Sequence, residues 1–187
     1  MTVLTPHPTL EEFLQSPDLD ASPAWEYRDG ERVQKLTPKF RHALLQKLLL
    51  STLQDPNDRY LTLPELRCTF AERSIVPDIV VIALDNIRLN DRGEPEDNFL
   101  QAPDWPIEIL SPDQSTNRVI DNLLHCLNHG SQLGWLVDPQ DYSILILTSP
   151  ADLKVCRGNQ QLPVLPDLDL RLTAQDIFAG LQLRKNP

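Results

Sequence analysis

Glycine is scarce in this sequence, and the few glycines exclude the common phosphate-binding loops. Only six of the 187 residues are glycine, and they form neither the loop of P-loop proteins nor the loop of dinucleotide-binding domains. Cysteine is scarce too. Cys68, Cys126 and Cys156 are odd in number and show no paired close spacing, which argues against a disulfide framework and against a zinc ribbon. We expect them to be reduced core residues.

Long apolar runs and targeting signals are also missing. No segment approaches the roughly 18 apolar residues of a membrane span. The N-terminal sequence MTVLTPHPTLEEF lacks the basic and then apolar pattern of a signal peptide. We therefore expect a cytoplasmic protein with no membrane partner. The length predicts a single domain, in which residues 1–23 form a lead-in and a helix, residues 24–160 the core, and residues 161–187 an arm and a short helix.

Positive charge is in short supply. The sequence has 17 basic and 27 acidic residues, a net charge of −10. Because phosphate contacts are the main source of non-specific affinity for nucleic acids, this charge argues against tight, indiscriminate DNA binding. Residues 24–50 differ, since they hold six basic and three acidic side chains, a local charge of +3 that leaves −13 for the remainder. A locally basic face there is compatible with DNA as a partner.

Turn and capping signals divide the sequence into helices and strands. Thr9 and Glu12 form a capping-box pattern that predicts a short helix, and Asp29-Gly30 between two alternating segments predicts a β-hairpin. Pro38 suits the first turn of a second helix. Strand-like runs cover residues 60–63, 66–70, 75–84, 107–110, 133–137, 143–148 and 153–156, and helical patterns cover residues 114–129 and 173–179. This order predicts an α/β fold with a mixed sheet.

One strand-like run is strongly apolar on both faces. Residues 144–147 read Ile-Leu-Ile-Leu, beside Trp135. Because an apolar strand at the edge of a sheet tends to be covered, this run predicts a homodimer. Trp105 and Trp135 flank strands, where core packing or a dimer contact explains them better than stacking on nucleic-acid bases.

Two carboxylates interrupt segments that otherwise resemble buried strands. Asp78 follows Pro77 at the start of one such segment, and Glu108 precedes Ile109 in another. Buried carboxylates are costly unless a cation or hydrogen-bond donors meet them. Side by side on neighbouring strands, Asp78 and Glu108 would hold a hard divalent ion such as Mg²⁺, with the carbonyl of Ile109 completing the shell. The alternative is structural, with Asp78 capping a strand and Glu108 paired with an arginine.

Several strings resemble one family. PDIVV, APDWPIEILSP and GWLVDP, with the earlier EYRDGERV and the late LPVLPDLDLRLTAQDIFAGL, resemble the Uma-type restriction endonucleases, a bacterial branch of the PD-(D/E)xK nuclease superfamily. The resemblance implies a restriction-endonuclease-like core, with a mixed central β-sheet flanked by helices and an N-terminal β-hairpin. It implies hydrolysis of DNA that depends on Mg²⁺, for which Mn²⁺ can substitute. It also implies that Asp78 and Glu108 bind the metal ion. It also places Glu26 and His42 near the site, although a half-exposed histidine at a helix start is the alternative for His42.

The lysine of that family is missing. The resemblance places it on the helix after Glu108, at the position of Asn122, and no lysine occurs between Lys47 and Lys154. Asparagine cannot supply the charge that would offset the charge of the transition state. Arg118 lies one helical turn earlier and could replace the lysine, although the two side chains are not interchangeable. A cation from the basic first helix, or a weakened site, is the alternative.

Two other functions stay open at this point. A nuclease fold that no longer turns over could act as a binding or regulatory module, which the missing lysine and the acidic net charge favour. Retention of both carboxylates in apolar strands favours the enzyme. A hydrolase for a smaller phosphodiester is also compatible with the residues. His125 and His129 superficially resemble a zinc-binding helix, but the glutamate between the histidines of a metalloprotease helix is absent.

Overall fold

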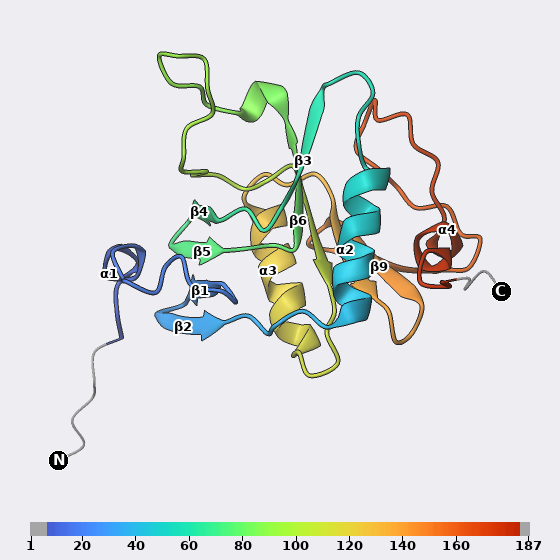
Figure 1. Ribbon diagram of the computed structural model, residues 1–187, viewed down its shortest axis with the longest axis horizontal. Coiled ribbons are helices and arrows are strands. Elements are labelled where there is room, and N and C mark those ends of the chain that lie inside the picture. Colours follow the sequence, from blue (N-terminus) through green and yellow to red (C-terminus); the bar gives the residue numbers. More distant parts are fainter. Residues whose placement is uncertain (1–6, 184–187) are drawn as a thin grey trace.

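Two β-sheets that meet at one junction make up the fold, and helices cover both faces of the larger sheet. Figure 1 shows the computed structural model, which describes residues 7–183. Within these residues the larger sheet has the strand order β10-β9-β8-β7-β6-β3 and the smaller one the order β2-β1-β5-β4. The strands are β1 (Trp25–Arg28), β2 (Glu31–Gln34), β3 (Tyr60–Pro64), β4 (Cys68–Phe70), β5 (Arg73–Ile75), β6 (Ile79–Ala83), β7 (Trp105–Ile109), β8 (Gly134–Asp138), β9 (Ser143–Ser149) and β10 (Asp152–Arg157). The helices are α1 (Leu10–Leu14), α2 (Phe40–Thr52), η1 (Leu84–Asn86), α3 (Thr116–Asn128) and α4 (Ala174–Ala179).

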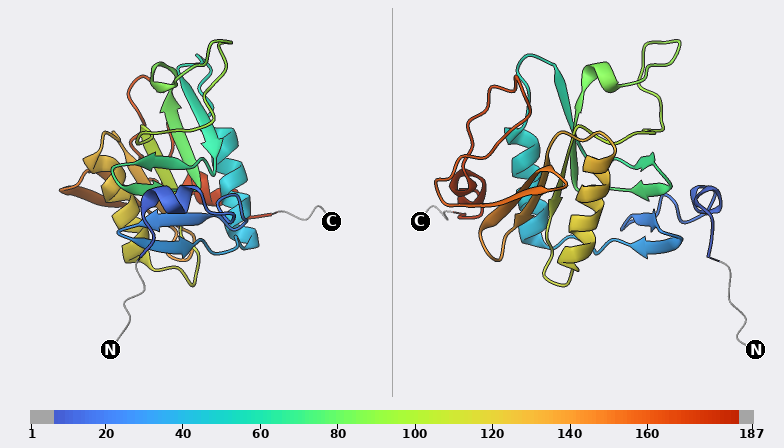
Figure 2. Two further views of the ribbon diagram at one scale, coloured as in Figure 1. Left: turned by 90° about the vertical axis from the view of Figure 1, so that its left-hand side faces the viewer. Right: turned by 180° about the vertical axis from the view of Figure 1, so that it is seen from behind.

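The larger sheet lies between α2 and α3, as the left view of Figure 2 shows. On one face, α2, α4 and the arm between β10 and α4 pack against apolar side chains of β6, β7, β8 and β9. On the other face, Val119, Leu123 and Leu127 of α3 pack against Leu136 and Leu147. The sheet is mixed, because β7 and β8 are parallel whereas β6 and β7 are antiparallel. The prediction of a mixed α/β fold with an N-terminal hairpin is confirmed.

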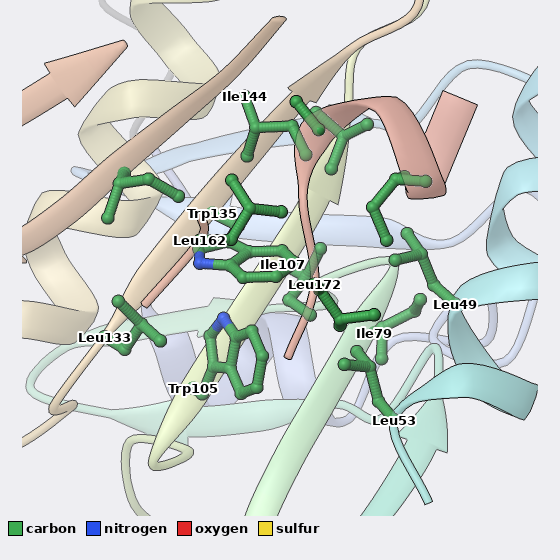
Figure 3. Packing of buried hydrophobic residues seen from close by; sticks show 14 of the residues in the cluster. Leu49, Leu53, Ile79, Trp105, Ile107, Leu133, Trp135, Ile144, Leu162 and Leu172 are labelled. Carbon is green, nitrogen blue, oxygen red and sulfur yellow. The ribbon is translucent and has the colours of Figure 1, made fainter. Parts of the chain in front are cut away.

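Trp105 and Trp135 form the centre of this core. Both side chains are fully buried, and their rings meet edge to face with centroids 4.6 Å apart. Figure 3 shows them among aliphatic side chains from the sheet and from α2, including Ile107 and Leu49. Such aromatic pairs contribute roughly 0.5–1.5 kcal/mol beyond the area that they bury. Core packing therefore accounts for both tryptophans.

The N-terminal hairpin forms where the turn signal predicted it. Asp29 and Gly30 both have positive φ angles, 51° and 83°, which the tight turn between β1 and β2 requires. Strand β1 also pairs with β5, so the hairpin becomes half of the smaller sheet. The short helix α1 begins with the predicted capping box of Thr9 and Glu12.

The apolar run 75–84 is divided between the two sheets, so the single strand predicted there is wrong. Strand β5 ends at Ile75, and β6 begins at Ile79 in the other sheet. Pro77 has no N–H for a ladder bond, and the N–H of Val76 donates to the side chain of Glu26 instead. The chain therefore changes sheets at Asp78.

Strand β9 is an inner strand, which corrects the edge predicted for residues 144–147. It pairs with β8 on one side and with β10 on the other. Ile144 and Leu147 are fully buried by neighbours within the chain. The basis on which the sequence predicted a homodimer is therefore removed.

Smaller predictions have mixed outcomes. Cys68, Cys126 and Cys156 are free and buried, as predicted. Pro38 was placed in the first turn of a helix, but it precedes Lys39, the residue that caps α2. None of the helices within residues 7–183 is long and apolar enough to cross a bilayer.

Candidate active site

The junction between the two sheets gathers acidic side chains from three separate elements. Asp78 lies where the chain passes from β5 to β6, and Glu108 lies on β7. Ile79 and Ile107 face each other across the ladder of β6 and β7, so the residues beside them are brought together. Glu26 comes from β1 of the smaller sheet. Asp78, Glu108 and Glu26 are buried, with exposures of 3%, 2% and 7%.

Asp78 is the better satisfied of the two central carboxylates. Its Oδ2 accepts a hydrogen bond from the backbone N–H of Ile109 at 2.7 Å and lies 3.0 Å from Nε2 of His42. Its Oδ1 accepts from the ammonium of Lys35 at 2.7 Å. Burial alone would raise the pKa of Asp78, but Lys35 and His42 together lower it below its ordinary value. Asp78 is therefore an anion in the folded protein at neutral pH.

Glu108 has much less to offset its burial. Its Oε2 lies 3.5 Å from Nζ of Lys35, a distance at the limit of a hydrogen bond. Burial raises the pKa of Glu108 well above its ordinary value; Lys35 counteracts this, whereas the nearby charges of Asp78 and Glu26 raise it further. Lys35 therefore does not fully compensate the negative charge of the site, and a further cation would be favoured there.

Lys35 is the residue that reasoning from the sequence missed. Its Nζ donates to the carbonyl of Val76 at 2.6 Å as well as to Asp78, and its side chain is only 15% exposed. Burial would lower the pKa of Lys35, but Asp78 and Glu108 raise it above its ordinary value, so the ammonium stays charged. The backbone N–H of Lys35 donates to Ala24 at 2.8 Å, which extends the hairpin and fixes where the side chain starts.

A polar wall lies beside these residues. Glu26 accepts from the N–H of Val76 at 2.9 Å through one oxygen and from Nδ2 of Asn122 at 3.2 Å through the other. Oδ1 of Asn122 and Nδ1 of His42 are buried and have no hydrogen-bond partner within residues 7–183. His42 is thus a buried residue of the site, which corrects the alternative of a half-exposed histidine. Both atoms are therefore available to a bound ligand or water.

Lys35 lines two cavities. One, of about 110 Å³, is lined by Lys35, Glu26, Glu108, Asn122 and Arg118. The other, of about 240 Å³, is lined by Lys35, His42 and Asp78, among others. Each of the six candidate side chains lines one of these two cavities, and the N–H of Ile109 donates to Asp78. Arg118 is the outermost of them: it is exposed on α3 and forms no ion pair with either central carboxylate.

Comparison with known proteins places the chain in a family. Residues 10–183 match the model of a family described as "Uma2: Putative restriction endonuclease". The chain belongs to the Uma2 family. It is also similar to a solved structure described as a putative nuclease belonging to DUF820, from Anabaena variabilis ATCC 29413. The two are 39% identical and superpose with a TM-score of 0.89, over 94% of this chain and 99% of the other. A search of curated proteins gives no match.

The Uma2 assignment gives the site a chemical context. The family and the solved relative both indicate a nuclease, and the restriction-endonuclease-like fold is confirmed. Nucleases with this fold generally use divalent metals. The sequence resemblance had placed the family's lysine at Asn122, and Asn122 does line the same cavity as Lys35 and Glu108. A lysine is thus present in this Uma2 site, but it comes from the segment after β2.

The oxygen atoms around the ammonium of Lys35 are suitable ligands for a hard cation. The ammonium meets a carbonyl oxygen and two carboxylate oxygens at 2.6–3.5 Å, and such oxygens are the ligands that Mg²⁺ prefers. Within residues 7–183, no three side chains of His, Cys, Asp or Glu gather as a metal cage. Mg²⁺ needs no such cage, because it keeps several waters and is commonly bound by one or two carboxylates. Asp78 and Glu108 are sufficient by that measure.

His125 and His129 serve packing rather than metal binding. The ring of His125 stacks on Phe70 with centroids 4.7 Å apart, and Nδ1 of His129 lies 2.7 Å from the carbonyl of His125. Burial and the nearby charge of Arg73 lower the pKa of His125 to about 4. The pair thus belongs to the structure of α3.

This pKa predicts a pH dependence of stability. An unfolded histidine has a pKa near 6.5 and takes up a proton more readily than the folded His125, so stability is lost as the pH falls from about 6.5 to about 4. His125→Phe keeps the stacking on Phe70 and removes the titration. We expect the fall of Tm between pH 7 and pH 5 to be smaller in this variant than in the wild type. His7→Gln, at an exposed histidine, is the control; an unchanged fall in His125→Phe would contradict the assignment.

Proposed function

We propose that this chain is a Mg²⁺-dependent endonuclease that hydrolyses phosphodiester bonds of DNA, with Mn²⁺ as a substitute. The observation that carries the proposal is the pair Asp78 and Glu108, two buried carboxylates brought together at a junction with unpaired polar atoms beside them. An evolved core rarely keeps such a pair without use, because each buried charge is costly.

The reaction adds water across a P–O ester bond. The oxygen of water bonds to phosphorus, the ester oxygen leaves with its electron pair and takes up a proton, and the proton of the water passes to solvent. Bound Mg²⁺ would polarise a phosphoryl oxygen and lower the pKa of a bound water. In this chain Asp78 and Glu108 would hold it, and Ile109 supports Asp78 through its backbone N–H.

Other residues of the site have supporting parts in the proposal. The Nε2 of His42 lies 3.0 Å from Asp78, and the carboxylate of Glu26 holds Val76 and Asn122 in place. Both side chains therefore orient groups that border the two cavities. Arg118, at the rim of the smaller cavity, would bind the phosphate backbone as it enters.

Two features support DNA as the substrate class. The solved relative carries the description of a nuclease, and its fold matches this chain over almost its full length. The basic segment 24–50 supplies both β1, which carries Glu26, and the start of α2, which carries His42. Positive charge therefore lies next to the site even though the net charge of the chain is −10.

Cleavage of supercoiled plasmid tests the proposal. We expect the wild type to nick or linearise plasmid in Mg²⁺ and in Mn²⁺ but not in EDTA. The double variant Asp78→Asn, Glu108→Gln should lose at least about 10³-fold, because a bound metal contributes several kcal/mol and each 1.36 kcal/mol is tenfold. Asp91→Asn, at an exposed carboxylate of the loop after β6, is the control and should cleave normally.

A wild type that is inert in both metals would refute the endonuclease. The chain would then be a nuclease fold that binds without turnover. Cleavage that persists in the double variant at the wild-type rate would point to a contaminating nuclease or to a different site.

A further inference from the structure

We propose that Lys35 is the catalytic cation of this site, in place of a lysine on α3. The inference rests on the proposed nuclease function and names a residue that the sequence did not single out. Lys35 lies on the connection between β2 and α2, far in sequence from Asp78, just before β6, and from Glu108 on β7.

The first ground is contact. Nζ of Lys35 lies 2.7 Å from Asp78 and 3.5 Å from Glu108, whereas within residues 7–183 Arg118 forms no ion pair with either carboxylate. Lys35 also lines both cavities, which a substrate phosphate could enter. A cation at that point could offset the negative charge that develops on the phosphate oxygens during hydrolysis.

The second ground is anchoring. The hairpin continues beyond β2, because the N–H of Lys35 donates to Ala24. Four residues later Lys39 caps α2, which carries His42 to the other oxygen of Asp78. Lys35 and His42 thus approach Asp78 from one continuous segment, and both ends of this segment are held by regular structure.

Asn122 occupies the position at which the family resemblance places a lysine. Asn122 on α3 borders the smaller cavity together with Lys35 and Glu108, and its amide is tied to Glu26. A lysine at position 122 would extend from the lining of the same cavity. The two positions can therefore serve one cation subsite, reached from α3 or from the segment after β2.

The same geometry predicts competition with a metal. The ammonium occupies oxygen atoms of Val76, Asp78 and Glu108 that a divalent cation would use. Lys35 must therefore shift toward one of the cavities when a metal binds. Removal of its charge should strengthen metal binding while it weakens cleavage, which a purely structural lysine would not do.

Lys35→Met and Lys39→Met form the matched pair for the test. Lys39 lies on the same segment and makes an ion pair of the same length, 2.7 Å, but with the exposed Asp113. With plasmid and Mg²⁺ we expect Lys35→Met to lose at least about 10²-fold in cleavage, and Lys39→Met to lose less than about threefold. By calorimetric titration, Lys35→Met should bind Mn²⁺ more tightly than the wild type does, and unchanged or weaker binding would contradict the competition.

The outcomes separate this inference from the proposed function. If the wild type cleaves and Lys35→Met cleaves equally well, or both lysine variants lose activity alike, Lys35 is not the catalytic cation although the nuclease stands. If the wild type is inert, both proposals fail. Should Lys35→Met not fold, Lys35→Arg carries the test: a loss of at least about tenfold is expected, since the planar guanidinium does not replace the ammonium, and unchanged cleavage would overturn the inference.

A transplanted lysine tests the shared subsite. Lys35→Met with Asn122→Lys should cleave at least about tenfold better than Lys35→Met with Asn122→Met, because only the former restores a cation to the cavity. Equal cleavage by these two double variants would overturn the idea that positions 35 and 122 serve one subsite.

Discussion

Glu108→Gln is expected to make the protein more stable while it abolishes cleavage. Glu108 is 2% exposed, and Lys35 at 3.5 Å is its ion-pair partner within residues 7–183. Glutamine keeps the shape and removes the charge that burial disfavours. Replacing a poorly compensated buried charge is often stabilising, so we expect a gain of about 1–2 kcal/mol, or roughly 3–6 °C in Tm. Chemical and thermal unfolding in EDTA measures it without any contribution from bound metal.

Asp104 provides the matched control for this prediction. It is another buried carboxylate, next to the start of β7, with an exposure of 6%. Unlike Glu108, it accepts from the N–H of Ala83 at 2.8 Å, from Asn86 at 3.0 Å and from Gln132 at 3.1 Å. Asp104→Asn should therefore destabilise the protein by about 1–3 kcal/mol. A Glu108→Gln variant that is destabilised to the same degree would mean that Glu108 is a structural residue.

The pair of carboxylates could be predicted from the sequence because both interrupt apolar strand patterns. Asp78 and Glu108 stand out in segments where a charge has no local reason to occur, and neighbouring strands usually pair. That reasoning depends only on local pattern and on simple topology. It placed two residues correctly at one junction, although it took the run 75–84 for one strand and so missed that Asp78 lies between two sheets.

Lys35 could not be found in this way, because nothing local distinguishes it from the other basic residues of its segment. Arg32 and Lys39 are near it in sequence and point elsewhere, to Asp18 and to Asp113. What selects Lys35 is tertiary: the smaller sheet pairs β1 with β5, and this brings the end of the hairpin to the point where the chain enters β6. In the hairpin Gln34 pairs with Trp25, so the next residue, Lys35, lies opposite Ala24 and donates its N–H to it.

The position of β9 could not be read from its apolar residues for a related reason. An apolar strand predicts that something covers it, but not whether the cover is a second copy or the same chain. Here the mostly exposed strand β10 forms the edge, and it pairs with β9 along the run that was taken for an edge. The apolar pattern of a strand predicts that it is buried, whereas the order of the strands in the sheet decides which segment buries it.

We expect Asp78→Asn to destabilise the protein, whereas Glu108→Gln stabilises it, although both substitutions abolish cleavage. The carboxylate of Asp78 contacts the ammonium of Lys35, Nε2 of His42 and the N–H of Ile109, so its negative charge is well compensated. The same carboxylate compensates the charge of the buried ammonium. Asparagine still offers Lys35 an amide oxygen but carries no charge, so Glu108 at 3.5 Å is left as the ion-pair partner of the ammonium within residues 7–183. Breaking a buried pair by removing one partner typically costs about 3 kcal/mol or more, which corresponds to roughly 6–12 °C in Tm for a chain of this size.

A double-mutant cycle separates the pair from its surroundings. Lys35→Met added to Asp78→Asn should recover most of the lost stability, because it removes the ammonium that was left unpaired. The pair of Lys39 and Asp113 has the same N–O distance, 2.7 Å, but both side chains are more than half exposed. The same cycle there should give a coupling free energy below about 0.5 kcal/mol, since water screens an exposed pair. Equal coupling in the two cycles would show that burial does not strengthen the pair of Lys35 and Asp78. Strong coupling at Asp78 alone would mean that this site binds a cation tightly even without a metal, and that a metal must compete with the protein's own ammonium.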